Sequence, residues 1–244
     1  MVAVIHWIER VESTNRIAQS TDFVHGDVIA TLDQTAGRGR MDRVWTMAPR
    51  AGVALTIVVS RTALGSPTHM TRLPLCVAVE LARIIAEHAS ASTRPTVKWP
   101  NDVLIDGRKV AGILIESLDT DRIAVGIGIN ISGVPAGLPP ETVTSLSAEG
   151  IRLTAAAIVP VLAESVIRRA QELDDELLLG ELTHANDTVG RQVQVELPDG
   201  RFVTGLATGL GSSGSLIVDT ANGSEEFVAG DVTHVRLGGD ESVR

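Results

Sequence analysis

The sequence has no tyrosine, and aromatic residues make up only 2% of its 244 positions, so its core must be built from Val, Ile, Leu and Ala. A single cysteine, Cys76, excludes an internal disulfide and a multi-cysteine zinc site. No apolar run approaches the ~18 residues that a membrane span requires, and residues 1–9 lack the basic segment of a signal peptide. We therefore expect a globular protein of a reducing compartment, the cytoplasm.

Basic charge is also scarce, because 21 Lys+Arg against 30 Asp+Glu give a net charge of −9. This balance argues against a general nucleic-acid binder, which needs an excess of cations. The six histidines are scattered without metal-ligand spacing, which gives a zinc enzyme or a histidine-based triad little support. Hydrophobic residues reach 44%, enough for a sizeable core.

The hydrophobic pattern changes character near residue 186. Before it, strands are predicted at 2–5, 28–32, 52–59, 103–105, 110–116 and 122–129. Helices are predicted at 74–87, with Pro74 in the first turn, and at 154–179, capped by Thr154 and kinked by Pro160. From Arg191 onward, turn signals about ten residues apart predict a small β-barrel. The predicted domains are therefore residues 1–186 and 187–244.

The segment from Gly37 to Arg50 is positively charged, whereas the chain as a whole is negatively charged. It carries Arg38, Arg40, Arg43 and Arg50 against the single acid Asp42. Glycines 37 and 39 let backbone N–H groups converge on an anion, and arginines can fork onto carboxylate or phosphate oxygens. The plainer alternative is a solvated basic loop.

A second cluster is Lys98-Trp99-Pro100-Asn101-Asp102, where Pro100 ends a strand and two polar side chains follow it. An amide can read an adenine edge, and a carboxylate can hold Mg²⁺ or take a proton from an amine. An ordinary turn explains the motif equally well. Lys109 follows the next predicted turn. It is either a solvent-exposed residue at the start of a strand or a cation that binds an anion inside a pocket.

The predicted strand at residues 123–130 has one apolar face and one nearly bare face. Ala124, Gly126, Gly128 and Asn130 alternate on the bare face. Since glycine weakens a strand, two glycines on one face indicate the close approach of a ligand or of another backbone. Tight packing of a helix on the sheet would also account for them.

Together these motifs resemble the biotin–protein ligase family. The resemblance rests on Gly37-Arg38-Gly39-Arg40 with Trp45, on residues 98–102, on residues 108–114 and on residues 126–130, with Ser13-Thr14-Asn15 upstream and Thr144-Ser145-Leu146 downstream. It covers essentially the whole chain. It implies an α+β fold of the class II synthetase-like biotin/lipoate ligase type, with a mixed, mostly antiparallel sheet, packed helices and a small C-terminal SH3-like β-barrel.

The resemblance also implies a two-step reaction. The biotin carboxylate attacks the α-phosphorus of ATP to give biotinyl-5′-AMP and pyrophosphate, and a lysine of a carrier domain then takes the biotin. The implied biotin-binding residues are Ser13, Thr14, Gln34, Gly37, Arg38, Gly112, Gly126 and Gly128. The implied ATP-binding residues are Arg40, Trp45, Asn101, Lys109 and Asn130. Arg40, Lys109 and Asp102 are the implied catalytic residues, with Asp102 orienting or deprotonating the incoming lysine.

The implied partners are biotin, ATP and the biotin carboxyl carrier domain of an acyl-CoA or pyruvate carboxylase. Mg²⁺ is expected through the phosphates, with Asp102 or Asn130 as candidate ligands. The implied assembly is a monomer or a weak homodimer. Some members add an N-terminal DNA-binding domain, but the Ser-Thr-Asn motif begins here by Ser13. A ligase without repressor function is therefore expected.

One departure from the family pattern lies in the arginine segment, where Met41-Asp42 replaces the usual glycine before Arg43. We expect an acid there to alter how tightly the segment closes. Two alternatives stay open: a lipoate or octanoate ligase of the same fold, and a non-catalytic biotin sensor. The first is disfavoured because neither glycine-rich run is followed by a histidine. The second is disfavoured because Lys109 and Asp102 are both present.

Overall fold

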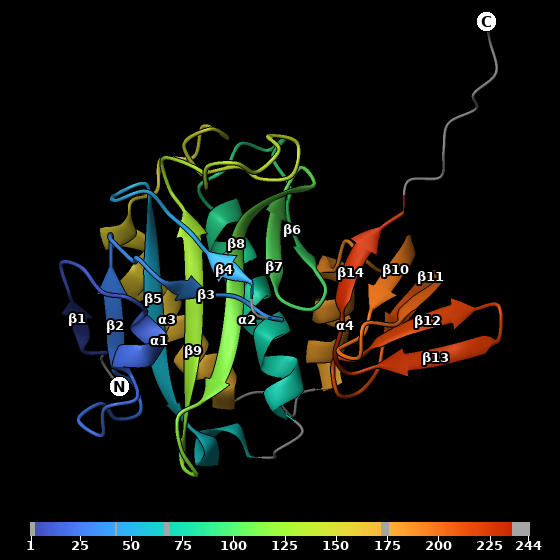
Figure 1. The fold of residues 1–244 in the computed structure, drawn as a ribbon, viewed down its shortest axis with the longest axis horizontal. Helices are drawn as coiled ribbons and strands as arrows, with labels where there is room; N and C mark the ends of the chain where they lie inside the picture. Colours follow the sequence, from blue (N-terminus) through green and yellow to red (C-terminus); the bar gives the residue numbers. More distant parts are fainter. Residues whose placement is uncertain (1–2, 42, 66–68, 172–175, 236–244) are drawn as a thin grey trace, which may run out of the picture.

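The computed structural model describes residues 3–41, 43–65, 69–171 and 176–235. They form two main sheets side by side, the larger with helices packed behind it and the smaller at the C-terminal end of the described residues (Figure 1). The fold is α+β, as predicted. Within the described residues, no helix is long and apolar enough to cross a membrane.

The larger sheet has seven strands in the order β1-β2-β5-β9-β8-β7-β6. Its strands are β1 (Ile5–Trp7), β2 (Val28–Thr31), β5 (Gly52–Ser60), β6 (Pro95–Lys98), β7 (Asp102–Ile105), β8 (Arg108–Ser117) and β9 (Arg122–Asn130). Only β1 and β2 pair in parallel; every other neighbouring pair is antiparallel. Asp106 and Gly107 both have positive φ, 48° and 78°, as a tight two-residue turn between β7 and β8 requires.

Two long helices cover one face of this sheet, α2 (His69–Ala86) and α3 (Ala155–Gln171) (Figure 1). The core consists mainly of Val, Ile, Leu and Ala, together with the buried indole of Trp99. Cys76 is 1% exposed in this core, where burial raises the pKa of its thiol to about 12. The thiol is therefore a packing group, as predicted.

The opposite face carries only short elements, so it stays open to a ligand. These are α1 (Thr14–Ile17), β3 (Gly37–Arg38) and β4 (Val44–Trp45) (Figure 1). A 3-10 turn, η1 (Arg61–Leu64), leads from β5 toward α2. The sequence predicted an irregular loop where β3 and β4 pair as a small antiparallel hairpin.

The C-terminal sheet has five antiparallel strands in the order β13-β12-β11-β10-β14. They are β10 (Gln192–Glu196), β11 (Phe202–Leu210), β12 (Leu216–Thr220), β13 (Gly223–Phe227) and β14 (Asp231–His234). No pairing between β13 and β14 closes the sheet within the described part of the chain, so the predicted barrel closure is not seen there.

Three boundaries differ from the sequence prediction. The first strand is Ile5–Trp7 rather than residues 2–5. Helix α2 begins at His69, so Pro74 lies inside it rather than in its first turn. The helix predicted over 154–179 is two helices, α3 and α4 (Glu176–Ala185), and Pro160 lies within α3. Residues 172–175 between them lie outside the described residues. Thr154 Oγ1 accepts a hydrogen bond from the Ala157 N–H, as a cap does.

The two sheets are joined through Trp99. Its indole N–H donates to the Gly214 carbonyl over 3.0 Å, and its backbone N–H donates to Thr188 Oγ1 over 3.0 Å. Gly214 has φ +77°, and a Cβ there would crowd Arg72 on α2. The strand end next to Asn101 and Asp102 is therefore fixed by the C-terminal module, which we define as residues 187–235.

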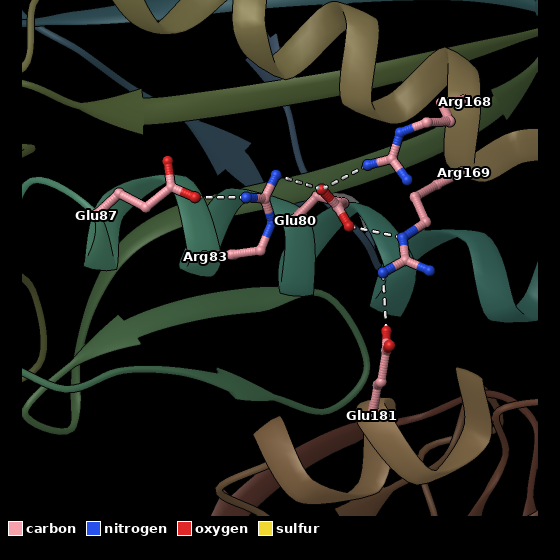
Figure 2. Close-up of polar contacts among 6 residues, drawn as sticks. All are labelled: Glu80, Arg83, Glu87, Arg168, Arg169 and Glu181. Carbon is pink, nitrogen blue, oxygen red and sulfur yellow. Dashed lines mark hydrogen bonds and ion pairs between the residues drawn. The ribbon is translucent and has the colours of Figure 1, made fainter. Parts of the chain in front are cut away.

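A buried carboxylate ties three helices together behind the sheet (Figure 2). Glu80 of α2 is 1% exposed and accepts from Arg169 of α3 over 2.6 Å and from Arg83 over 3.1 Å. Arg169 also donates to Glu181 of α4 over 2.8 Å. Burial raises the pKa of the Glu80 carboxyl, but hydrogen bonds from Arg169 and Arg83 outweigh it and hold the pKa below its usual value.

This network predicts a pH-dependent loss of stability in Glu80→Gln. The variant leaves Arg169 without its buried counter-charge, so its free energy of unfolding at pH 7 is lower by about 3 kcal/mol. Because the carboxyl has a depressed pKa in the folded state, its stabilisation is present above pH ~4.3 and is lost as pH falls through the folded pKa. Urea unfolding at several pH values measures the difference.

Glu87→Gln is the matched control, since Glu87 also accepts from Arg83 but is 53% exposed. It should change the free energy of unfolding by less than about 0.5 kcal/mol. Equal changes in the free energy of unfolding for the two substitutions would contradict the role of Glu80 as a buried carboxylate that stabilises helix packing.

Candidate functional site

A cleft of about 1280 Å³ lies on the open face of the large sheet and extends to the C-terminal module. Thirteen of the predicted site residues line it: Ser13, Thr14, Gln34, Arg38, Arg40, Trp45, Asn101, Asp102, Lys109, Gly112, Gly126, Gly128 and Asn130. Gly37 does not line it. A Cβ on Gly37 would lie 2.4 Å from Gln34 Nε2, so this glycine lets Gln34 approach.

One end of the cleft is lined by uncharged polar side chains. The Thr14 N–H donates to Gln34 Oε1 over 2.9 Å, and Thr14 Oγ1 lies 2.8 Å from Thr56 Oγ1. The Thr56 hydroxyl donates to Asn15 Oδ1 over 2.5 Å. All four side chains are buried. We call Thr14, Asn15, Gln34 and Thr56 the polar pocket; such a cluster suits a neutral ligand group with both donors and acceptors.

The bare face of β9 lies beneath this pocket and the middle of the cleft. A Cβ on Gly126 would lie 2.4 Å from Asn15 Oδ1, and one on Gly128 would lie 2.3 Å from Trp45 Cε2. The predicted close approach is therefore real, and within the protein it is made by an amide and a flat indole. Gly112 of β8 meets Lys109 Nζ in the same way, at 3.1 Å.

Lys109 and Asp102 meet in the middle of the cleft. Lys109 Nζ lies 2.6 Å from Asp102 Oδ1 and 5.8 Å from the centre of the Trp45 ring. Both side chains are partly exposed to the cleft, at 31% and 19%. Lys109 is therefore an inward-facing cation rather than a solvated strand end, within reach of an anion.

The β3–β4 hairpin is held at both ends by its arginines. Arg38 Nη2 lies 2.8 Å from Glu116 Oε1 of β8. Arg40 donates to the Gly230 carbonyl over 3.0 Å, and Arg43 forms an ion pair with Asp231. Asp42, the unusual acid, lies outside the described residues.

Two donors in the cleft have no hydrogen-bond partner within the described part of the chain, Arg40 Nε and Trp45 Nε1. Burial lowers the pKa of the Arg40 guanidinium, although Asp231 and Asp102 act in the opposite direction. Unsatisfied buried donors are rare in folded proteins. Here both belong to the hairpin above the sheet, which is consistent with a ligand that supplies the acceptors.

The side-chain amides of Asn101 and Asn130, both predicted site residues, each donate one hydrogen bond to the backbone. Asn101 Nδ2 donates to the Ile113 carbonyl over 2.6 Å, and Asn130 Nδ2 donates to the Thr144 carbonyl over 3.0 Å. Each side chain is buried and fixed by this bond. The amide oxygen is then the group that each can offer to a ligand or a metal ion.

The far end of the cleft lies against the C-terminal module, which the sequence did not predict. Lys98, Arg191, Thr233 and His234 line it. Burial lowers the pKa of His234 to about 4, helped by the charges of Lys98 and Arg191. The imidazole is therefore neutral at physiological pH. Lys98 and Arg191 are the cations at this end, and Arg191 is paired with Asp187 over 2.6 Å.

Sequence reasoning missed Asn15, Glu116 and Asp231. Asn15 follows the predicted Ser13 and Thr14 directly, so its neighbours were a usable signal. Glu116 lies at position i+4 from Gly112 on the same strand, hence on the same face. No local sequence pattern identified Asp231, because the fold brings β14 to the hairpin from a distant part of the chain.

Comparisons with known proteins agree with this geometry. Residues 7–132 match the family model of the biotin/lipoate A/B protein ligase family, and residues 188–235 match that of the biotin protein ligase C-terminal domain. A biotin–[acetyl-CoA-carboxylase] ligase of Mycobacterium tuberculosis is 31% identical over 232 residues, with 91% of this chain and 83% of the relative covered.

Solved structures show the same fold. A biotin protein ligase from Aquifex aeolicus, in complex with biotin and ATP, superposes with a TM-score of 0.80 at 22% identity, over 96% of this chain and 99% of that one. A biotin protein ligase from Leishmania major, in complex with biotinyl-5-AMP, has a TM-score of 0.67 at 26% identity, over 93% and 99%.

The contacts of the hairpin predict that Asp231→Asn opens it. Loss of the ion pair to Arg43 raises the population of the open hairpin, and cleavage by a protease follows that population. Limited trypsin digestion should therefore cut after Arg40 or Arg43 severalfold faster than in the parent protein. Asp219→Asn, an exposed change on β12 of the same module, should leave the rate unchanged. Equal rates in both variants would contradict a role for Asp231 in closing the hairpin.

Proposed function

Because the chain belongs to the biotin/lipoate A/B protein ligase family, we infer that it is an ATP-dependent biotin protein ligase. It activates biotin to biotinyl-5′-AMP and transfers the biotin to a lysine of an acceptor protein. Its substrates are biotin, ATP and that acceptor.

One observation carries this proposal: a single cleft joins the uncharged polar pocket to a group of cations. The ureido ring of biotin is neutral and has both donors and acceptors, which matches Thr14, Asn15 and Gln34. The biotin carboxylate and the ATP phosphates are anions, which match Lys109 and Arg40. A ligand lying along the cleft would contact the Asn15 amide and the Trp45 indole, which lie directly against the glycines of β9.

In the first step, a carboxylate oxygen of biotin forms a bond to the α-phosphorus, and the bond from that phosphorus to the pyrophosphate oxygen breaks. Two anions must approach each other, so neutralisation is the main requirement. Lys109 lies in the middle of the cleft, with its ammonium in place for the carboxylate and the phosphate oxygens. Arg40 lies above them, and its Nε is a donor with no partner among the described residues.

In the second step, the amine of the acceptor lysine forms an amide bond with the biotin carbonyl, and AMP leaves. The amine must lose a proton, and the Asp102 carboxylate is the candidate base. Asp102 is bound to Lys109 at 2.6 Å. Phosphate oxygens that bind Lys109 would compete for this cation and leave Asp102 for the incoming amine.

Mg²⁺ fits the donors present. No group of three or more His, Cys, Asp or Glu that could hold a metal ion occurs in the described ranges. Mg²⁺ instead commonly binds substrate phosphates with one or two protein oxygens. Asp102 or the amide oxygen of Asn130 is the candidate protein ligand. The ion would neutralise charge on the phosphates.

The acceptor that we propose is the biotin carboxyl carrier domain of an acyl-CoA or pyruvate carboxylase, acting in the cytoplasm. The name of the Mycobacterium tuberculosis relative supports a carboxylase as acceptor. We further propose that residues 1–186 form the catalytic domain and 187–244 the small one. The two family matches, 7–132 and 188–235, lie on either side of that boundary.

The direct test is ATP–pyrophosphate exchange by the purified protein, with biotin, lipoate or octanoate as the acid. Exchange with biotin alone is the expected result. Exchange with lipoate or octanoate instead would assign the chain to a lipoate or octanoate ligase. Biotin binding without exchange would assign it to a non-catalytic sensor.

Lys109→Ala should lower biotin-dependent exchange by about 10²- to 10³-fold, because the two anions then meet without their central cation. Arg94→Ala removes an exposed cation outside the cleft and should leave the rate unchanged. Exchange by Lys109→Ala at the parental rate would exclude Lys109 from the first step.

Arg40→Ala should release the intermediate. The hairpin then loses its bond to Gly230, and a mobile cover holds a reactive anhydride poorly. After a single turnover and gel filtration, the variant should retain severalfold less biotinyl-5′-AMP than the parent. Undiminished retention would show that Arg40 does not hold the intermediate.

A further inference from the structure

We propose that Glu116 is a positioning residue that orients the polar pocket and fixes the arginine hairpin over it, and so determines selectivity for a ureido ring over an alkyl chain. The proposal rests on the proposed function. Glu116 is not one of the described residues that line the cleft, so it acts through Asn15 and Arg38 rather than by touching the substrate.

One carboxylate bridges two distant parts of the chain. Glu116 Oε2 accepts a hydrogen bond from Asn15 Nδ2 over 2.7 Å, and Oε1 lies 2.8 Å from Arg38 Nη2. Asn15 lies on α1, Arg38 on β3 and Glu116 on β8. The acid is only 26% exposed, so these two contacts satisfy a carboxylate that is largely removed from water.

The first contact determines which way round the Asn15 amide lies. Glu116, when ionised, can only accept, so the NH₂ group of Asn15 must face it. The amide oxygen then faces the Thr56 hydroxyl, which donates to it over 2.5 Å. Asn15 is 5% exposed, and Gly126 beneath it leaves no room for a shift toward β9. The donors and acceptors offered to the ligand are therefore set by Glu116.

The second contact is an ion pair that attaches the hairpin to the large sheet, in addition to the packing of Trp45 against Gly128. Strands β3 and β4 are two residues long and pair only with each other. Their contacts at Arg40 and Arg43 run to the C-terminal module, whereas the Arg38 contact runs to β8. Glu116 therefore contacts both Asn15, where the ligand would bind, and Arg38, which holds the hairpin against the sheet.

This arrangement explains selectivity between the acids that the family handles. A ligand that bonds to an oriented, buried amide is favoured, and an alkyl chain leaves the same groups unpaired. Sites built on such hydrogen bonds discriminate far better than apolar pockets do. If the Asn15 amide can adopt either orientation, the pocket discriminates less strongly against an alkyl chain.

The test is Glu116→Gln, which keeps the size of the side chain but removes its charge and lets the amide of Asn15 turn over. In biotin-dependent ATP–pyrophosphate exchange, the KM for biotin should rise about tenfold, as expected for a charged hydrogen bond. The KM for ATP should stay within about twofold. Glu164→Gln, an exposed change on α3, is the control and should alter neither value.

A second measurement separates positioning from a general loss of structure. In a cycle of Arg38→Ala, Glu116→Gln and the double variant, the effects on biotin KM should be clearly less than additive, because both single changes remove the same ion pair. Unfolding midpoints should agree among the folded variants. Octanoate-dependent exchange, which is not expected in the parent protein, should rise above background in Glu116→Gln.

Three results would overturn the proposal: an unchanged biotin KM, equal rises in the KM for biotin and ATP, or strict additivity in the cycle. Each of these would leave exchange by the parent protein intact, so the proposed function would stand. Absence of biotin-dependent exchange in the parent protein would overturn the proposed function itself, and this inference with it.

Discussion

The cleft exists because two positions on β9 carry no side chain. Gly126 and Gly128 face the open side of the sheet, and the Asn15 amide and the Trp45 ring occupy the space where their Cβ atoms would be. The opposite face of the same strand carries Ile123, Val125, Ile127 and Ile129, which belong to the same hydrophobic core as residues of α2 and α3. A rigid, well-packed strand thereby presents a flat backbone surface, on which the polar pocket and the hairpin are assembled.

The charge of the site depends on a second constraint, which is that three of its cations have carboxylate partners inside the protein. Lys109 is bound to Asp102, Arg38 to Glu116 and Arg43 to Asp231. In a chain with a net charge of −9, such pairs keep several cations close together without mutual repulsion. Substrate anions then compete with carboxylates that are already in place, and the cations need little rearrangement.

Much of this could be predicted from the sequence, because the signals were local. The alternation of Ile and Gly over residues 123–130 identified a strand with one bare face, and Asp106-Gly107 identified the turn before Lys109. The extent of α2 could not be predicted, because Pro74 is tolerated inside the helix by packing that its neighbours do not reveal. The short strands β3 and β4 were missed since their order depends on contacts with β8 and β14. Glu116 and Asp231 were missed for the same reason: their partners are 78 and 188 residues away.

The contact of Arg40 with the Gly230 carbonyl links the site to a residue that is synthesised 190 positions later. On the ribosome, the large sheet can pair all seven of its strands before β14 emerges, because its last strand ends at Asn130. The hairpin, however, has no Gly230 or Asp231 to hold it at that stage, and Trp99 has no Gly214 to cover it. A nascent chain therefore carries an open cleft, and the cover is completed only when translation has passed residue 231. Synthesis itself thus orders the assembly of the site, with the polar pocket first and the closure over its anions last.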